Sequence, residues 1–155
     1  MELYEYVPSD TKLNPTFKAK WLAALRSGDY EQAGATLRGV PADYNDDPLP
    51  GADAMFCCLG VACDLINPDW NANGETVETA NGSIYVYDWY DTDEEYVSYS
   101  TTSDLPFLPD IEVSTPGERT MTGSEFTRRV GSQIATMNDK GKTFEEIADC
   151  IEANL

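Results

Sequence analysis

Residues 54–66, with the sequence AMFCCLGVACDLI, constrain the fold more than any other segment. A helix over these residues is apolar nearly all round, so the rest of the chain must cover it on every side. We therefore expect it to be the buried central helix, with Asp53 as its N-cap and Asn67 and Pro68 at its end. A chain of 155 residues is long enough to bury such an element within one domain, residues 1–155.

The N-terminal part of the chain predicts a helical hairpin. Its first helix begins at Pro15 and ends at Gly28, which we expect in the left-handed conformation. The apolar stripe of this helix is Phe17, Trp21, Leu22 and Leu25. A second short helix is expected to follow, because Asp29 and Gln32 have the spacing of a capping box.

The middle of the chain predicts a loop followed by a small antiparallel meander. Residues 39–52 are rich in Pro, Gly and Asp, which is typical of a loop. Residues 76–79 and 83–90 flank Asn81-Gly82, a strong hairpin signal.

A third strand is expected at residues 96–100, after an acidic turn at residues 91–95. Residues 111–113 predict a short edge strand, which offers a pairing surface to a second copy of the chain.

The C-terminal part of the chain predicts two helices. Thr122 and Glu125 have capping-box spacing before one apolar stripe, and Thr143 and Glu146 repeat that spacing before the next. The expected fold is therefore α+β, with helices from both ends closed over the small meander.

Several kinds of chemistry are disfavoured by composition. The chain has no histidine, which removes the commonest general base and the commonest metal ligand. Its four cysteines, Cys57, Cys58, Cys63 and Cys150, form no paired C-x-x-C knuckles for zinc, and we expect them to be buried free thiols. No phosphate-binding glycine loop is present. We expect a protein that is not an enzyme and that uses no metal or cofactor.

The net charge of −18 is unevenly placed along the chain. Residues 39–118 hold 17 acidic residues and no Lys or Arg, whereas the flanks hold the other 11 acidic residues and all 10 basic ones. The flanks therefore carry only −1 (10 − 11), and the central 80 residues carry −17. Such a region does not bind nucleic acid directly, and its field speeds encounter with a basic partner.

Three segments carry a resemblance to known sequences: FKAKWLAALRSGDYEQA at residues 17–33, FCCLGVACDL at 56–65, and NDKGKTFEEIADCIEANL at 138–155. Together they resemble a family of small, mostly uncharacterised proteins encoded by tailed bacteriophages and prophages. The resemblance implies no particular activity. It implies a phage protein that acts in the cytoplasm of an infected bacterial host, where such accessory proteins often inhibit host factors by binding.

Sequence signals agree with a cytoplasmic protein. Residues 1–12 lack the apolar core of a signal peptide. The longest apolar run, residues 55–63, is far shorter than the roughly 20 residues that span a bilayer.

The leading functional hypothesis rests on the acidic and aromatic segment YVYDWYDTDEEY, residues 85–96. On a strand, Tyr85, Tyr87 and Trp89 point one way and can pack on the helices, while Ile84, Val86 and Asp88 point to a solvated face. With carboxylates that mimic DNA phosphates, this face would occupy a basic surface of a host protein that handles nucleic acid. The expected contact residues are Asp88, Trp89, Tyr90, Asp91, Asp93, Glu94, Glu95 and Tyr96.

The alternative is a small-molecule-binding protein that sequesters a nucleotide-type immune second messenger. Its polar site would lie at the turn of the helical hairpin, with arginine for phosphate and tyrosine for a base or ribose. The residues of this alternative site are Trp21, Lys20, Arg26, Ser27, Tyr30, Gln32 and Arg38. A further basic group could bind a phosphorylated ligand, although such residues usually form a solvated face: Arg119, Arg128, Arg129, Lys140 and Lys142.

Overall fold

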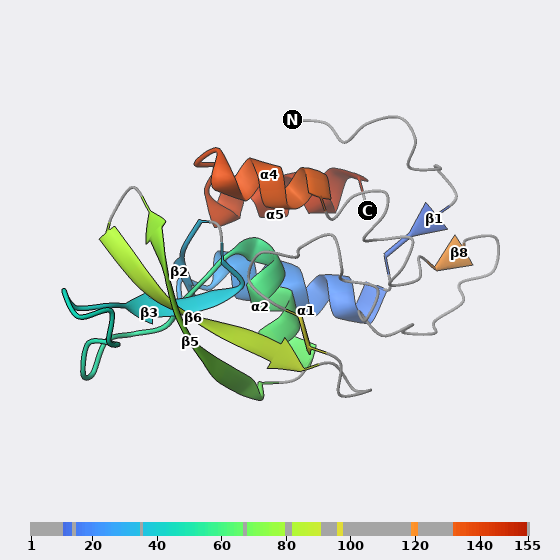
Figure 1. The fold of residues 1–155 in the computed structure, drawn as a ribbon. Helices are drawn as coiled ribbons and strands as arrows, with labels where there is room; N and C mark the ends of the chain where they lie inside the picture. The colour runs from blue at the N-terminus through green and yellow to red at the C-terminus, as the bar shows by residue number, and fades with distance from the viewer. Residues whose placement is uncertain are drawn as a thin grey trace.

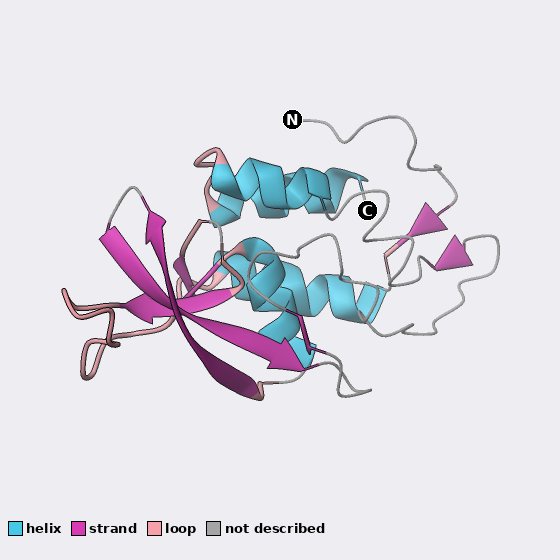
Figure 2. Cartoon of the chain, in the orientation of Figure 1, coloured by secondary structure: helices cyan, strands magenta, loops and turns pink. Residues whose placement is uncertain are grey.

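The computed structural model describes residues 11–13, 15–34, 36–66, 68–79, 82–90, 96–97, 119–120 and 132–154. Its helices are α1 (Pro15–Arg26), α2 (Cys58–Ile66), α4 (Ser132–Asp139) and α5 (Phe144–Asn154). Its strands are β1 (Thr11–Lys12), β2 (Glu31–Gln32), β3 (Arg38–Pro41), β4 (Met55–Phe56), β5 (Trp70–Thr79), β6 (Gly82–Tyr90), β7 (Tyr96–Val97) and β8 (Arg119–Thr120). The helices gather to one side of a twisted sheet (Figures 1 and 2). The predicted α+β class is confirmed.

The main sheet has six strands in the order β2-β4-β3-β6-β5, with β7 also paired to β6. The predicted antiparallel meander is its β5–β6–β7 part. The prediction missed β3, which lies between β4 and β6 and pairs antiparallel with both. It also missed the parallel pairing of β2 with β4, so the sheet is mixed. A separate parallel pair joins β1 to β8.

Helix α1 forms as its sequence predicts. Phe17, Trp21 and Leu25 are its buried residues, one turn apart along a single stripe. The indole Nε1 of Trp21 donates to the carbonyl oxygen of Cys58 at 3.0 Å, which ties α1 to the start of α2. Gly28 follows the helix with a φ of 79°, the left-handed conformation that was expected.

The prediction of a second helix in the N-terminal hairpin is wrong. Residues 31–32 form strand β2, and the side chain of Gln32 does not cap its own segment. Its Oε1 instead accepts from the backbone N–H of Phe144 at 3.1 Å, and its Nε2 donates to the carbonyl of Lys142 at 2.7 Å. Gln32 therefore satisfies the N-terminus of α5, more than 100 residues away in sequence.

Helix α2 is the buried central helix, as predicted. It begins at Cys58 and not at residue 54, because Met55 and Phe56 pair with β2 and β3. Gly60 lies against the backbone of Leu37, where a Cβ atom would overlap the Leu37 carbonyl oxygen. A glycine is therefore required at that position.

The hairpin and the last helix also match their sequence signals. The pairing of β5 with β6 places Thr79 opposite Gly82, as expected for a hairpin, and Gly82 has a φ of 113°. At α5 the predicted capping box is present, since the N–H of Glu146 donates to Thr143 Oγ1 at 3.1 Å and the N–H of Thr143 donates to Glu146 Oε1 at 3.4 Å. The start predicted for the preceding helix, at Thr122 and Glu125, lies outside the described residues, as does the predicted edge strand at residues 111–113.

One hydrophobic cluster joins both ends of the chain to its middle. Trp21 of α1, Val61 of α2, Trp89 of β6, Ile134 of α4 and Ile147 of α5 all belong to it and are fully buried. A second, smaller cluster lies at the sheet and is formed by Ala33, Ile84 and Val86. Within the part of the chain that the structure describes, no helix is long and apolar enough to cross a membrane.

Candidate functional site

The described carboxylates of residues 39–90 form what we call the acidic surface. Six of its nine side chains are exposed and three are half-buried, and no Lys or Arg occurs between residues 39 and 90. Its members are Asp43, Asp46, Asp47, Asp53, Asp64, Asp69, Glu75, Glu78 and Asp88. The charge asymmetry counted along the sequence is therefore present on the folded surface.

The structure divides the predicted contact segment. Asp88 is half-buried on β6, and Trp89 is fully buried in the main cluster, so Trp89 is a core residue and not a contact residue. Tyr90 and Tyr96 face each other as a backbone pair between β6 and β7. The remaining four predicted contact residues lie outside the described residues: Asp91, Asp93, Glu94 and Glu95.

Three residues of β6, Ile84, Val86 and Asp88, were expected to face solvent, and this prediction is wrong for two of them. Ile84 and Val86 are 5% and 0% exposed, because Ala33 packs against them together with parts of Met55 and Val77. The strand is therefore covered on both faces along part of its length, and strict inside–outside alternation does not apply. Tyr85 and Tyr87, on the opposite face, are half-buried, and their rings meet edge to face at 5.7 Å.

The connection between β3 and β4 presents an exposed aromatic residue. We call residues 42–51 the Tyr44 loop, which projects beyond the sheet at the left of the view in Figure 1. The side chain of Tyr44 is 95% exposed and that of Leu49 is 41% exposed. Both are flanked by the exposed carboxylates of Asp46 and Asp47.

Hydrogen bonds hold this loop in a defined conformation. Asp43 Oδ1 accepts from the N–H groups of Asn45 at 2.8 Å and Asp47 at 3.0 Å, and the Asp43 N–H donates to the Asp47 carbonyl at 2.7 Å. The N–H of Leu49 donates to the carbonyl of Pro41 at 2.8 Å. Sequence reasoning predicted only a loop here. The Asp-x-Asn spacing signals a side-chain turn, but no sequence pattern reports that Tyr44 stays outside the core.

Most residues of the alternative ligand site have bonding partners within the fold. Trp21 lies in the core, and Ser27 Oγ donates to the Ala24 carbonyl at 2.7 Å at the end of α1. Arg26 forms two ion pairs with α5, to Glu152 at 2.6 Å and Asp149 at 2.8 Å. Hydrogen bonds to these carboxylates, first Glu152 and then Asp149, raise the pKa of Arg26.

Tyr30 and Asp64 take part in a structural network. Tyr30 Oη donates to Asp64 Oδ2 at 2.7 Å, and Trp70 Nε1 donates to Asp64 Oδ1 at 2.9 Å. Burial, and then the neighbouring Asp64, raises the pKa of Tyr30 to about 12. The ring of Phe56 lies between the rings of Tyr30 and Trp70, at 5.1 Å and 6.0 Å. These groups stabilise the contact between β4 and the end of α2.

Arg38 differs from the other residues of the alternative site. Its guanidinium carbon lies 4.1 Å from the ring centroid of Tyr87 and 5.9 Å from that of Trp70. No carboxylate among the described residues lies within ion-pair distance of it. We call Arg38, Trp70, Tyr85 and Tyr87 the arginine–aromatic row. All four side chains are half-buried.

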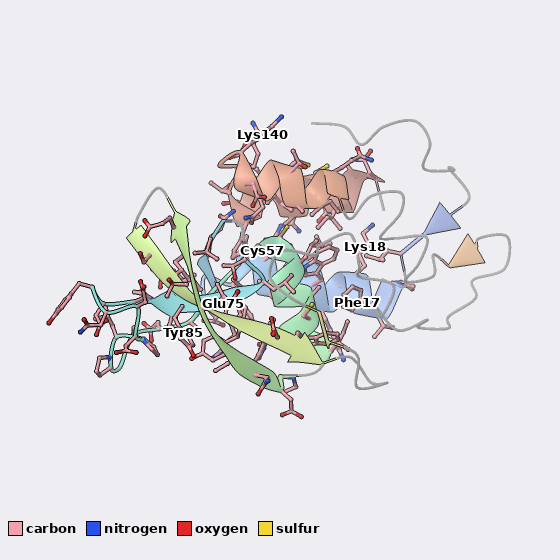
Figure 3. The ribbon with its side chains drawn as sticks, viewed as in Figure 1. Phe17, Lys18, Cys57, Glu75, Tyr85 and Lys140 are labelled. Atoms are coloured by element: carbon pink, nitrogen blue, oxygen red, sulfur yellow. The ribbon has the colours of Figure 1, made fainter. Side chains whose placement is uncertain are left out.

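The described members of the further basic group, Arg119, Lys140 and Lys142, do not lie on one element. Lys140 and Lys142 are exposed at the α4–α5 turn. Figure 3 shows Lys140 at the top of the view and Tyr85 on the sheet below it. The ammonium of Lys142 lies 3.7 Å from Glu146 Oε2. Arg119 is in β8, whereas Arg128 and Arg129 lie outside the described residues, and Lys20 is an exposed residue of α1.

The cysteines are buried and free, as predicted. Burial raises the pKa of the Cys57 thiol to about 11 and that of the Cys58 and Cys63 thiols well above the ordinary range. These thiols are therefore protonated and unreactive at neutral pH. The described residues contain no group of three side chains suited to hold a metal ion.

Comparisons with known proteins add a family but no activity. Neither a curated protein nor a solved structure matches the chain. A family model matches residues 13–155, which include every described element from α1 to α5. The chain therefore belongs to the family described as a domain of unknown function, DUF8296.

Proposed function

We propose that this protein is a non-enzymatic binding protein whose acidic surface occupies a basic surface of another protein. The observation that carries the proposal is the one-sided charge of residues 39–90, where nine carboxylates and no cation occur. Seventeen carboxylates and no cation occur over residues 39–118 as a whole. A field of one sign over so much of a surface raises the rate of encounter with an oppositely charged partner.

The class of partner follows from the same charge. Proteins that handle nucleic acid carry grooves of Lys and Arg that neutralise phosphates. A surface of fixed carboxylates competes for such a groove, whereas nucleic acid itself is repelled. Together with the resemblance to tailed-phage proteins, this favours a phage-encoded inhibitor that acts on a host nucleic-acid-handling protein, as counter-defence or host takeover, in the cytoplasm of the infected bacterium.

The Tyr44 loop offers a residue that can become buried in the interface, which exposed charges alone do not provide. Exposed charges set the association rate, while the energy of most interfaces comes from a few aromatic or large apolar anchors that become buried. Tyr44 is such an anchor, and its loop is already ordered by the hydrogen bonds of Asp43, so little entropy is lost when it is buried. We therefore place Tyr44 and Leu49 at the centre of the interface, with Asp46 and Asp47 beside them.

The test compares two charge reversals of equal size. The partner is captured from host lysate with the wild-type chain, purified, and its binding kinetics are measured in low and high salt. Asp46→Lys with Asp47→Lys removes charge from the acidic surface, whereas Asp29→Lys with Glu31→Lys removes the same charge from exposed residues outside it. The first variant is expected to lower the association rate by about 10-fold or more. The second is expected to change it little.

A second reversal examines the segment predicted from sequence. It changes four residues to lysine: Asp91, Asp93, Glu94 and Glu95. Raising the salt concentration should weaken the wild-type complex steeply, because long-range attraction is screened. Equal loss of binding in the Asp29–Glu31 control, or a salt-independent complex, would contradict the proposal.

A further inference from the structure

Arg38 begins β3 and lies at the junction of three strands. The pairing of Gly39 with Val86 places Arg38 beside Tyr87 on the neighbouring strand, and Tyr87 in turn pairs with Ala72 of β5. The guanidinium carbon lies over the Tyr87 ring at 4.1 Å from its centroid, and 5.9 Å from the centroid of the Trp70 ring. This places one cation and three aromatic rings on adjacent strands β3, β6 and β5.

Among the residues that the structure describes, Arg38 has no anionic partner, which is unexpected in so acidic a chain. Acidic residues outnumber basic ones by 28 to 10, and Arg26 contacts two carboxylates. Arg38, although half-buried, contacts none among the described residues. The planar fork of a guanidinium presents N–H donors that fit a carboxylate or a phosphate.

The backbone next to this row is irregular. Ala72 pairs with Tyr87 and Thr76 pairs with Tyr85, so residues 73–75 of β5 bulge opposite a single residue of β6. Gly74 lies in this bulge with a φ of 77°, and the Tyr85 hydroxyl is 3.9 Å from where a Gly74 Cβ would be. Figure 3 shows Glu75 of the bulge and Tyr85 on the same hairpin. Bulges of this kind occur often beside binding sites.

We propose that the arginine–aromatic row binds a small planar monoanion. The anionic group would accept hydrogen bonds from Arg38, and the planar part would stack on the exposed portions of the Tyr85, Tyr87 and Trp70 rings. A single negative charge is favoured because the acidic surface repels each additional one, and residues 39–90 provide no second cation. This inference is independent of the proposed protein partner, which contacts the acidic surface.

The probes are two monoanions that differ in their anionic group. Cyclic AMP supplies a phosphodiester on a purine nucleoside, and indole-3-acetate supplies a carboxylate on an indole. Adenosine and inorganic phosphate test the planar part and the anion separately. Binding is measured by calorimetry and by tryptophan fluorescence, in which Trp70 is the reporter because Trp21 and Trp89 are fully buried. We expect at least one monoanion to bind and both separate parts to bind more weakly.

Two arginine substitutions localise the binding. Arg38→Gln should weaken it roughly 10-fold or more, the usual effect of losing hydrogen bonds to a charged group. Arg26→Gln, which makes the same change at an arginine of the helical layer, should leave it unchanged. The affinity of the monoanion should stay constant or rise as salt is added, because salt screens its repulsion by the acidic surface. The complex with the basic protein partner should show the opposite salt dependence. Absence of binding by both monoanions, equal binding of inorganic phosphate, or equal loss in both variants overturns the proposal.

Discussion

Asn138 holds three separate segments together with one side chain. Its Oδ1 accepts from the backbone N–H of Cys58 at 3.1 Å and from Gln32 Nε2 at 3.0 Å, while its Nδ2 donates to the Ala33 carbonyl at 2.7 Å. The side chain is 4% exposed, so these groups have no access to water as an alternative. Asn138 is the first residue of the Asn-Asp-x-Gly motif that underlies the phage resemblance, and this gives the motif a structural role.

Replacing Asn138 by alanine should destabilise the fold strongly. The change leaves the Cys58 N–H and the Ala33 carbonyl buried without their partner, which costs about 2–4 kcal/mol of unfolding free energy. Asn154→Ala is the matched control, because Asn154 bonds to Cys150, four residues away in the same helix, and its loss should cost about 0.5 kcal/mol. Urea denaturation of both variants measures the difference. Equal costs would contradict the structural role of Asn138.

Gly60 makes a second prediction at the residue scale. Alanine is the better helix former by about 1 kcal/mol, so helix propensity alone predicts stabilisation by Gly60→Ala. The Cβ would however overlap the carbonyl oxygen of Leu37, a backbone atom that cannot move without shifting β3. We expect a loss of about 3 kcal/mol or failure to fold. Gly34→Ala, whose Cβ would meet only Asp139 Oδ1 at 3.9 Å, should be close to neutral. A stabilised Gly60→Ala variant would show that the close approach is absent.

At the scale of elements, local signals succeeded where the stabilising contacts are local. The stripe of α1, the hairpin before Gly82 and the capping box of Thr143 and Glu146 are all read from neighbouring residues, and all are present. Residues 29–41 were predicted wrongly because their partners are remote. Gln32 and Asp29 have capping-box spacing, but Gln32 binds the start of α5 instead, and no local pattern reports a partner 112 residues away.

The candidate site shows the same division. The charge asymmetry could be predicted by counting residues along the sequence, without knowledge of the fold. Burial of Trp89, exposure of Tyr44 and the position of Arg38 beside Tyr87 depend on strand pairings between distant segments. The alternation of side chains along β6 correctly predicted that Trp89 packs in the core. It wrongly predicted that Ile84 and Val86 are solvent-exposed, because Ala33, in the connection between β2 and β3, covers them.

Two protonated groups packed beside α2, Cys57 and Tyr30, give a prediction about alkaline pH. The raised pKa values of Cys57, about 11, and Tyr30, about 12, mean that the folded state keeps protons which the unfolded state releases near pH 9 and pH 10. Stability is therefore complete below pH 9 and falls as the pH rises toward 11 and 12. Urea midpoints measured from pH 8 to pH 11 should decrease steadily. Tyr30→Phe should reduce the decrease above pH 10. A midpoint that is constant over this range would argue against these buried protonated groups.

At the scale of the whole molecule, helices from both ends of the chain form the layer that covers the sheet. Trp21 of α1 and Ile147 of α5 meet Trp89 of β6 in one cluster, and Arg26 links α1 to α5 by two ion pairs. Both parts of the chain contribute to the core, since α2 and Trp89 belong to residues 39–118, whereas the excess negative charge belongs to those central residues alone. Self-repulsion therefore comes mainly from the central residues, and added salt weakens it without removing the hydrophobic contacts of the core.

Adding sodium chloride should therefore raise the melting temperature, although it weakens binding to a basic partner. Screening relieves repulsion within the acidic surface, and each 1 kcal/mol relieved corresponds to roughly 2–4 °C for a chain of this size. Neutralising three exposed carboxylates, Asp46→Asn, Asp47→Asn and Asp53→Asn, should raise the melting temperature at low salt and flatten its salt dependence. Asp149→Asn with Glu152→Gln, which removes the partners of Arg26, should not raise it. Calorimetry between low and high salt measures both effects. A melting temperature that falls with salt would mean that ion pairs of the helical layer outweigh the repulsion of the acidic surface.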